Sequence, residues 1–197
     1  MKILITEFIS LDGVVQAPGA PHEDTDGGFT HGGWSMKYFD PAVMGGTYDK
    51  LAKESDALMQ GRRTYQVSAD AWPNRSGDVF SDWINNVQKY VVSNTLIDED
   101  IKWGPATIIR GDDFVKVVSD LRAQPGGYIY VYGSAMMVQS LFAADLVDEL
   151  LLTIEPIILG GGKTIFATNG NAIPFELVSS EQASSGALVC RYVRADR

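Results

Sequence analysis

Cysteine is almost absent from this sequence, and long apolar runs are missing altogether. Cys190 is the one cysteine among 197 residues, so no disulfide can form within the chain, and a reducing compartment suits it. No apolar stretch approaches the roughly 20 residues that span a bilayer. Glu7 follows the first apolar residues at once and no small-residue cleavage site is present, which indicates a first strand rather than a signal peptide. We therefore expect a cytoplasmic protein without a membrane partner.

Basic residues and histidines are scarce as well. Lysine and arginine number 16 against 25 acidic residues, a formal net charge of -9. This balance argues against a nucleic-acid partner, because neutralising phosphates needs a basic surface. A local cluster of arginines could still hold one phosphorylated cofactor. His22, His31 and Cys190 stand too far apart in the sequence to suggest a metal site, so no metal is expected.

What the sequence does contain is an alternation of strand and helix patterns. We expect strands at residues 2–9, 55–60, 89–93, 106–109, 128–132 and from 150 to about 160, and helices at 41–54, from 61, at 78–87, 112–122 and 133–144. A final antiparallel hairpin is expected from Phe175 onward. This order predicts one α/β domain over residues 1–197, with a mixed, mostly parallel sheet that helices cover on both faces.

Residues 13–39 form a long segment with weak periodicity and many glycine, proline, aspartate and histidine residues. A loop of this length inside a compact domain is unusual and is often functional. We expect it to act as a lid that excludes solvent. Its acids, Glu23, Asp24 and Asp26, are expected to be solvated rather than to bind a ligand.

Three predicted strand exits carry residues that suit a ligand, because ligands of open α/β sheets bind beyond the carboxyl ends of the strands. The most informative exit is Gly61, Arg62, Arg63 and Thr64. The charges of two arginines at the start of a helix are repelled by the partial positive charge of that helix end, unless an anion binds there. Helix N–H groups and guanidinium groups both favour phosphate. The alternative is a glycine-terminated strand followed by two solvated arginines and a threonine cap.

The other two exits are less specific. Gly133, Ser134 and Ala135 would let a pyrophosphate reach backbone N–H groups, although a tight turn with a serine cap is the more common arrangement. Ser93 and Asn94 could donate to a phosphate, but taken alone they more simply end a strand.

Two further stretches border this expected site. Asp12 follows the first strand and could bind a polar substrate or relay a proton, although its spacing favours a turn aspartate before Gly13. Trp34 and Phe39 could wall an aromatic substrate or pack in the core. The sequence GGGKT at residues 160–164 resembles the end of a P-loop, but Ile157 stands where that motif needs glycine. We interpret it as a flexible turn followed by more strand.

Five stretches occur in an order that carries a resemblance. They read SLDG at residues 10–13, DALMQGRRTY at 56–65, KYVVS at 89–93, VYGS at 131–134, and LVDEL at 146–150 running to EPIILGGG at 155–162. Together they cover nearly the whole chain. The series resembles the dihydrofolate reductase superfamily, and it is more similar to the reductase domain at the C-terminus of the bifunctional riboflavin-biosynthesis deaminase-reductase than to dihydrofolate reductase itself. The resemblance implies a three-layer α/β/α fold, NADPH as cofactor and a homodimer.

The resemblance also implies roles for individual residues. By this resemblance the adenosine 2′-phosphate would be bound by Arg62, Arg63, Ser93 and Asn94. The pyrophosphate would be bound by Thr64 and by the N–H groups of Gly133, Ser134, Ala135 and Met136, and Gly61 would allow its close approach. Residues around Ser10 to Val14 would border the nicotinamide and the substrate. That placement makes Asp12 the best candidate for a substrate contact, beside Gly13, Val14, Trp34 and Phe39.

These features favour an oxidoreductase that passes hydride from NADPH to a small pterin-like, aminopyrimidine-like or carbonyl substrate. Its reaction would resemble that of 5-amino-6-(5-phosphoribosylamino)uracil reductase, with the proton taken from water or Asp12. Dihydrofolate reductases place an acid early in the helix before the second strand, whereas residues 41–46 contain none. This departure supports the alternative of an NADP(H)-binding or sensor protein without turnover. A third possibility is an α/β interaction domain that binds no nucleotide.

Overall fold

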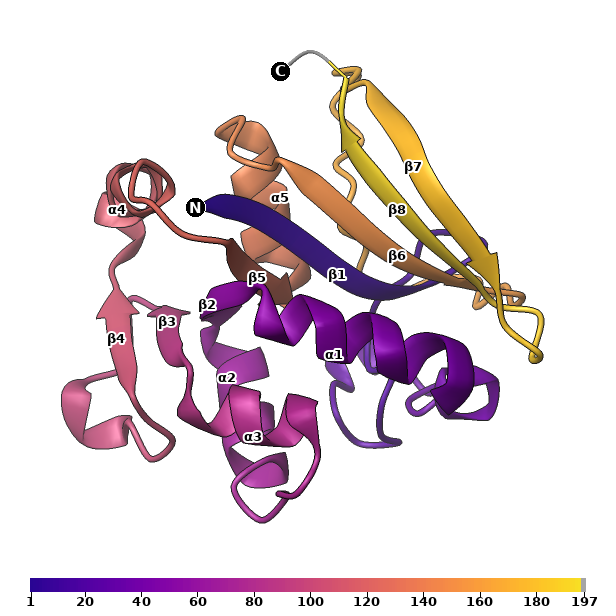
Figure 1. Ribbon diagram of the computed structural model, residues 1–197, viewed down its shortest axis with the longest axis horizontal. Coiled ribbons are helices and arrows are strands. Elements are labelled where there is room, and N and C mark those ends of the chain that lie inside the picture. The colour runs from indigo at the N-terminus through magenta and orange to yellow at the C-terminus, as the bar shows by residue number, and fades with distance from the viewer. Residues whose placement is uncertain (196–197) are drawn as a thin grey trace.

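Eight strands form one sheet in the computed structural model, which describes residues 1–195 (Figure 1). They lie in the order β4-β3-β2-β5-β1-β6-β8-β7. The strands are β1 (Lys2–Ser10), β2 (Ser55–Gly61), β3 (Gln88–Val92), β4 (Ala106–Ile109), β5 (Tyr128–Tyr132), β6 (Glu149–Glu155), β7 (Phe175–Gln182) and β8 (Leu188–Arg194). In this described part the β6–β8 and β7–β8 pairs are antiparallel and the other pairs are parallel, so β8 points opposite to the other strands. The expected mixed, mostly parallel sheet is confirmed.

Helices cover both faces of the sheet. The first three are α1 (Gly46–Lys53), α2 (Arg62–Ala71) and α3 (Val79–Asn86), which pack on one face, and α4 (Phe114–Arg122) and α5 (Ala135–Ala143) pack on the other. The two-residue period of β1 serves both layers, because Ile3 and Ile5 pack toward α4 and α5 while Leu4 packs toward α1. This is the three-layer α/β/α fold. No helix within residues 1–195 is long and apolar enough to cross a membrane.

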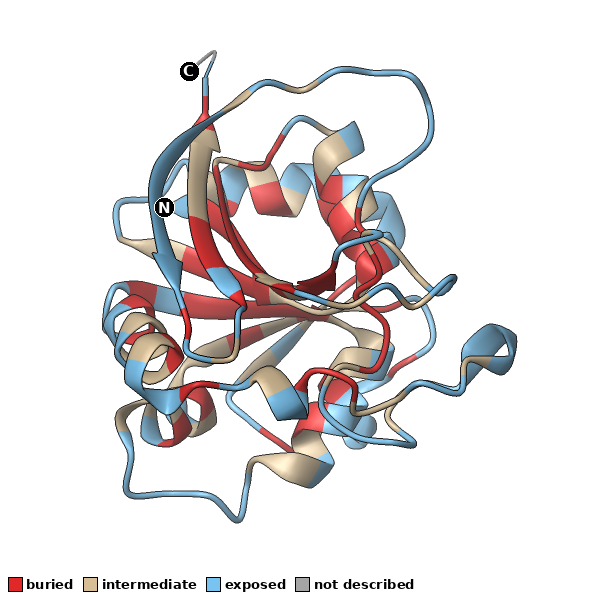
Figure 2. Ribbon diagram, turned by 90° about the vertical axis from the view of Figure 1, so that its right-hand side faces the viewer, coloured by how far each residue is buried: buried red, intermediate tan, exposed pale blue. Residues whose placement is uncertain are grey.

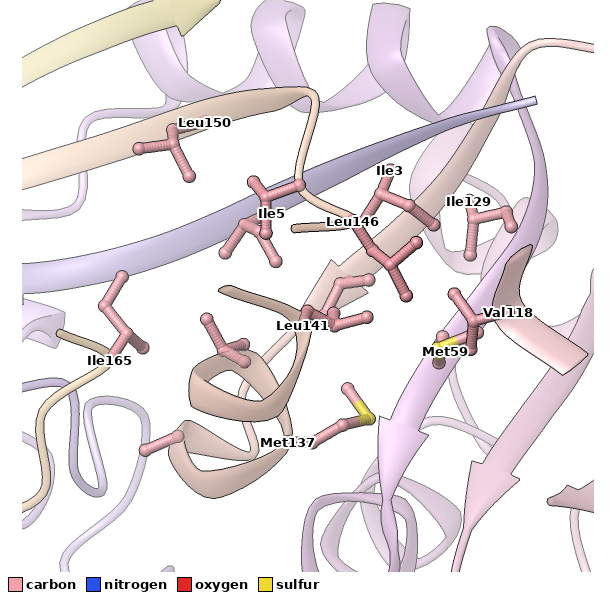
Figure 3. Close-up of a cluster of buried hydrophobic side chains, with 14 of the residues drawn as sticks. Ile3, Ile5, Met59, Val118, Ile129, Met137, Leu141, Leu146, Leu150 and Ile165 are labelled. Carbon is pink, nitrogen blue, oxygen red and sulfur yellow. The ribbon is translucent and has the colours of Figure 1, made fainter. Parts of the chain in front are cut away.

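Each face of the sheet buries its own apolar cluster. Figure 2 shows the buried residues gathered on the strands and on the helix surfaces that face them. On the α4–α5 side, Ile3, Ile129 and Leu141 are fully buried within one cluster (Figure 3). On the α1–α3 side the cluster is richer in aromatic rings, and those of Trp83 and Tyr130 lie 5.2 Å apart between centroids. The two clusters hold the strand ends in fixed relative positions.

The strand expected from residue 150 to about 160 is shorter than the sequence suggested. β6 ends at Glu155, and Pro156 follows, which has no N–H to donate to a ladder. Farther along, the N–H groups of Leu159 and Gly160 donate to the carboxylate of Asp12 instead of to a neighbouring strand. The prediction of a strand after the glycine run is also wrong, because residues 163–165 form only an isolated β-bridge, which joins Thr164 to Val14.

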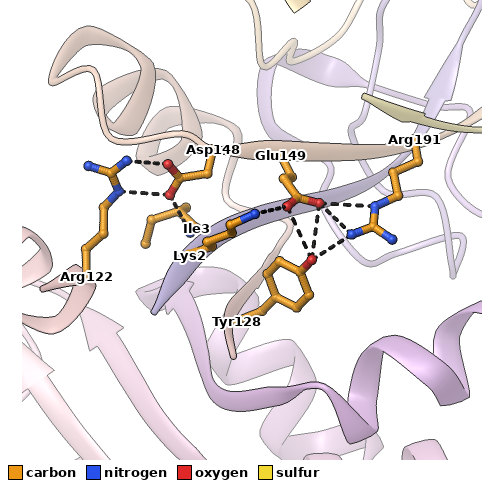
Figure 4. A network of polar contacts seen from close by, with 7 residues as sticks. All are labelled: Lys2, Ile3, Arg122, Tyr128, Asp148, Glu149 and Arg191. Carbon is orange, nitrogen blue, oxygen red and sulfur yellow. Dashed lines mark hydrogen bonds and ion pairs between the residues drawn. The ribbon is translucent and has the colours of Figure 1, made fainter. Parts of the chain in front are cut away.

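Paired charges tie together the amino ends of the central strands (Figure 4). The buried carboxylate of Glu149 accepts from Lys2 at 2.9 Å and from Arg191 at 2.7 Å, and the Tyr128 hydroxyl donates to it at 3.2 Å. Beside it, Asp148 forms an ion pair with Arg122. The buried carboxylate of Glu149 and the partly buried one of Asp148 each have a partner of opposite charge, which offsets the cost of desolvation.

Candidate functional site

The opposite edge of the sheet, where the parallel strands end, brings two of the predicted strand exits together. β2 and β5 are neighbours, so Gly61 and Gly133 leave the sheet side by side. The hydroxyl oxygen of Ser134 accepts the N–H of Gly61 at 2.7 Å, and the same hydroxyl donates to Oγ1 of Thr64 at 2.7 Å. One serine side chain thus joins the start of α2 to the start of α5.

Both glycines are required by this close packing. A Cβ atom on Gly133 would lie 2.7 Å from Cγ2 of Thr64, and its φ of +65° already disfavours any other residue. A Cβ on Gly61 would lie 2.8 Å from Oγ of Ser134. Ser134 itself has φ 64°, a conformation that costs energy for a residue with a side chain and is frequent at functional sites.

The first turns of α2 and α5 also share an electrostatic property. Neither contains an acidic residue, and neither is capped by a side chain. By contrast α3 begins at Asp78, whose carboxylate accepts the N–H of Ser81 at 2.8 Å. Uncapped N–H groups give a helix start a partial positive charge, and Arg62 and Arg63 add to it. This corner is therefore suited to an anion.

The two arginines make different contacts. Arg62 donates to Oε1 of Gln66, one turn along α2, at 3.1 Å. Arg63 forms an ion pair with Asp26 of the 13–39 loop, and Lys163 pairs with both Asp24 and Asp26. The expectation that the loop acids are only solvated needs correction for Asp24 and Asp26, whose carboxylates pair with cations far away in the sequence, although Asp26 stays exposed. Glu23 accepts the backbone N–H groups of Gly19 and Ala20 instead.

The remaining predicted cofactor residues lie near this corner in the sheet order. Ser93 follows β3, the neighbour of β2, and its hydroxyl oxygen accepts the N–H groups of Thr95 and Leu96 at 3.1 and 3.0 Å. Asn94 accepts the N–H of Gly111 at 2.6 Å. These are the contacts of a turn that ends a strand, and a phosphate contact from either residue stays a prediction. Ala135 is buried at the start of α5, whereas Met136 is exposed.

Asp12 acts as a clamp between two loops. Its carboxylate accepts the N–H groups of Leu159 and Gly160 at 3.1 and 2.8 Å and the hydroxyl of Ser10 at 2.6 Å. The Ser10 hydrogen bond, with help from the backbone donors, lowers the pKa of Asp12 to about 2. An acid that stays ionised at neutral pH is poorly suited to proton donation, so the geometry favours the turn interpretation of Asp12.

The other predicted substrate residues differ in how accessible they are to a substrate. Gly13 adopts φ +84° in the turn after β1, and Val14 is buried. Trp34 is buried as well and donates its indole N–H to the carbonyl of Gln16 at 2.8 Å, within the 13–39 loop. Phe39 is 43% exposed. Trp34 therefore packs as part of the loop, and Phe39 is the more accessible of the two rings.

A cavity of about 510 Å³ lies between the 13–39 loop and the glycine turn, lined among others by Gln16, Phe29, His31, Gly160 and Lys163. The interpretation of residues 160–162 as a turn agrees with this position. Within residues 1–195, no group of three histidine, cysteine, aspartate or glutamate side chains is placed to hold a metal ion.

Sequence reasoning missed three polar side chains inside the strands. Among residues 1–195, the buried side-chain atoms without a hydrogen-bond partner are Oε1 of Glu7, Oε1 of Gln60 and Oε2 of Glu155. All three lie toward the carboxyl ends of β1, β2 and β6. Burial raises the pKa of Glu7 well above its ordinary value, although a hydrogen bond from the Gly133 backbone opposes the shift. The available signal for the two acids was their place in strands of a sheet that was expected to be covered on both faces.

Comparison with known proteins matches residues 1–189 to the family described as the RibD C-terminal domain. The chain is 25% identical over 199 residues to the uncharacterized protein YyaP of Bacillus subtilis (strain 168), which covers 97% of this chain and 94% of YyaP.

Two solved structures share the fold. One, from Shewanella sp. PV-4 and named for riboflavin biosynthesis, gives a TM-score of 0.74 at 22% identity and covers 98% of this chain and 99% of its own. The other, dihydrofolate reductase from Enterococcus faecalis complexed with NADP(H), gives 0.61 at 15% identity and covers 99% and 97%. This chain belongs to the RibD C-terminal domain family and has the dihydrofolate reductase-like fold.

Proposed function

We propose that this protein is an NADPH-dependent reductase that transfers hydride to a C=N or C=O group of a small heterocyclic or carbonyl substrate. The observation that carries the proposal is the joined start of α2 and α5. Two helix starts without acids or side-chain caps are held side by side by Ser134, and Arg62 and Arg63 stand in the first turn of α2. Such a corner favours a ligand with several phosphate groups.

The residues of this corner fit the cofactor. The hydroxyls of Thr64 and Ser134 and the N–H groups at residues 133–136 would hold the pyrophosphate, and Gly61 keeps the backbone accessible. Arg62 and Arg63 would bind the 2′-phosphate, with Ser93 and Asn94 at the neighbouring strand exit. NADPH supplies a hydride when bound, and the protein's part is to orient it and to exclude water.

The substrate side of the proposal concerns the ends of β1 and β6. Asp12, Gly13 and Val14 follow β1, and the 13–39 loop, which carries Trp34 and Phe39, would close over the substrate. Family membership supports a pterin-like or aminopyrimidine-like compound, including a ribosylaminopyrimidine of the kind reduced in riboflavin biosynthesis.

We further propose a cytoplasmic homodimer. Cys190 is a buried free thiol, which suits a reducing compartment. β7 is an edge strand, and Leu177 and Val178 on it are each 55% exposed. Exposed apolar residues on an edge strand favour pairing with a second chain. Sedimentation of the purified protein tests this, and a monomer at micromolar concentration would contradict it.

The central experiment measures binding of NADPH and NADH by fluorescence and then NADPH oxidation with a panel of pterins, ribosylaminopyrimidines and small carbonyls. We expect tight binding that depends on the 2′-phosphate, and oxidation with at least one compound. Binding without oxidation by any compound would favour the NADP(H)-binding or sensor alternative. The absence of an acid at residues 41–46 supports that alternative. Absence of binding would leave the interaction-domain alternative.

A further inference from the structure

The buried carboxyl group of Glu155 is the strongest feature that the fold leaves unexplained. Glu155 ends β6 beside Ser10, the last residue of β1, so it lies at the sheet edge where the proposed function places the substrate. The residue is 0% exposed. The period of β6 puts it on the α1 side with Thr153, whose hydroxyl lies 2.8 Å from that of Tyr48 in α1.

The hydrogen bonding of this carboxyl is incomplete in either protonation state. Ser35 donates its hydroxyl to Oε1 at 2.6 Å, and Oε2 has no partner among the described residues. If the group is ionised, Oε2 lacks a donor. If it is protonated on Oε2, that O–H lacks an acceptor. A buried polar atom left in this state costs free energy, so a partner from outside the chain is expected to complete it.

The charged and titratable groups that face Glu155 are few. Ser35 and Lys37 belong to the segment at residues 34–38 that covers it, Tyr48 faces it from α1, and Ser10 lies beside it on β1. Burial raises the pKa of Glu155, and the hydrogen bond from Ser35 and the charge of Lys37 oppose this shift. The net effect is a pKa of about 7. Burial also raises the pKa of Tyr48, so that its phenol stays neutral.

We propose that Glu155 is a catalytic acid of this reductase, which binds the substrate's ring nitrogen or carbonyl oxygen through Oε2 and donates its proton there. This inference rests on the proposed function. The reduction needs a proton as well as a hydride. The C=N or C=O double bond becomes C–H and N–H or O–H, NADPH is oxidised to NADP⁺, and the carboxylate left on Glu155 regains its proton from water.

The other acids near this edge are less suited to the step. Asp12 is held ionised by the N–H groups of Leu159 and Gly160. Glu7 lies on the opposite side of the sheet, toward α5 and the backbone of Gly133. A catalytic acid works best when its pKa lies near the working pH, and Glu155 is the acid here that meets this condition. It also supplies, from β6, the carboxyl that residues 41–46 lack.

The first test follows the carboxyl without any turnover. Infrared difference spectra of the free protein between about pH 5 and pH 9 should show a carboxyl that titrates near pH 7 and disappears in Glu155→Gln. Ser35→Ala keeps the carboxyl but removes its donor, so the midpoint should rise by about half a pH unit or more. The exposed Glu176→Gln is the matched control. A spectrum in which Glu155→Gln removes no such signal would overturn the proposal.

The second test uses NADPH and 6-methyl-7,8-dihydropterin, a compound with a reducible C=N bond, or the compound of the panel that is turned over fastest. We expect kcat/KM of the wild type to fall above about pH 7 and Glu155→Gln to lose roughly 10²- to 10⁴-fold together with that pH break. The NADPH Kd should stay within about twofold, which also shows that the variant is folded. Ser35→Ala should shift the break upward.

The outcomes separate the two ideas. A wild type that binds no NADPH defeats the proposed function, and with it the role of Glu155. A wild type that binds and oxidises NADPH, with Glu155→Gln equally active and its pH break retained, defeats the role of Glu155 alone.

Discussion

The carboxylate of Asp26 forms an ion pair with the guanidinium of Arg63, so that the 13–39 loop rests on the first turn of α2. The same carboxylate also pairs with Lys163 beyond β6. Asp26 therefore sits where the proposed function places a phosphate of the cofactor. Loop and cofactor are expected to compete for one cation, and the loop should be released from α2 as NADPH binds.

Replacing Asp26 by asparagine tests this competition. An exposed ion pair contributes about 0.2–1 kcal/mol, and 1.4 kcal/mol corresponds to a tenfold change in affinity. Asp26→Asn should therefore lower the Kd for NADPH by up to about fivefold, as measured by fluorescence titration. Asp24→Asn is the control, because it removes a partner of Lys163 and leaves the pair with Arg63. Weaker NADPH binding by Asp26→Asn would show that the loop acid supports the cofactor site instead.

Arg62 provides a test of cofactor choice. Its guanidinium contacts Gln66 at 3.1 Å on the same helix, so it is free to turn toward a phosphate at little cost. A charge-assisted hydrogen bond contributes about 1.5–3 kcal/mol, and Arg62→Ala should weaken NADPH roughly tenfold or more while changing the Kd for NADH less than about twofold. Gln66→Ala, which removes only the helix contact, should leave both affinities nearly unchanged. Equal losses for the two nucleotides would refute the role given to this arginine.

Gly133→Ala tests the packing that joins the two helix starts. The added Cβ would lie 2.7 Å from Cγ2 of Thr64 at a φ of +65°, which combines backbone strain with overpacking. Gly160 has φ +79° with no atom within 4 Å of such a Cβ, so Gly160→Ala isolates the backbone cost of about 1–2 kcal/mol. We expect urea denaturation to show Gly133→Ala losing about 1–3 kcal/mol more than this control.

Removing the contact between a Cβ at residue 133 and Cγ2 of Thr64 gives a second test of the same packing. Thr64→Ser removes Cγ2 and keeps the hydroxyl that Ser134 contacts. In the Gly133→Ala background this change should recover part of the lost stability. Full additivity of the two substitutions would mean that the steric contact is not the cause.

The order of strands and helices and the residues at their exits could be predicted because both depend on short-range patterns. Gly61 and Gly133 end apolar strands, and adjacency of the exits follows once the sheet is parallel. The pair of Asp26 with Arg63 could not be predicted, because no periodicity relates a loop acid to a helix start far along the chain. The contacts of Asp12 with Leu159 and Gly160 are hidden for the same reason.

The two buried acids show a different limit. In β1 and β6 an acid flanked by apolar residues fits the alternation of a half-exposed strand, which would place Glu7 and Glu155 in solvent. Both faces of this sheet are covered, so both acids are buried. Burial on both faces is a property of the assembled layers and not of either strand.

Glu7 should make the stability of the protein depend on pH. Its pKa is raised by burial well above the ordinary 4.5, so its full contribution to stability is present below about pH 4.5 and is lost as the pH rises toward the folded-state pKa. Over that range stability falls by up to about 1.4 kcal/mol per pH unit. Glu7→Gln removes this loss, so its free energy of unfolding relative to the wild type should increase between about pH 4 and pH 8. The same comparison with the exposed Glu176→Gln should stay flat.

Asp12→Asn distinguishes a loop clamp from a proton relay. Because the pKa of Asp12 is lowered from 3.8 to about 2, the clamp is expected to be fully present above about pH 4 and to be lost as the pH falls through about 2. Asparagine keeps one acceptor oxygen but presents an NH₂ group toward the other backbone donor, so the amides of Leu159 and Gly160 should exchange hydrogen faster, as mass spectrometry can measure. For a clamp, KM should rise while the pH dependence of kcat/KM keeps its break near pH 7. If Asp12→Asn instead abolished that break and left both amides protected, Asp12 would be the proton source, and the assignment of that step to Glu155 would be wrong.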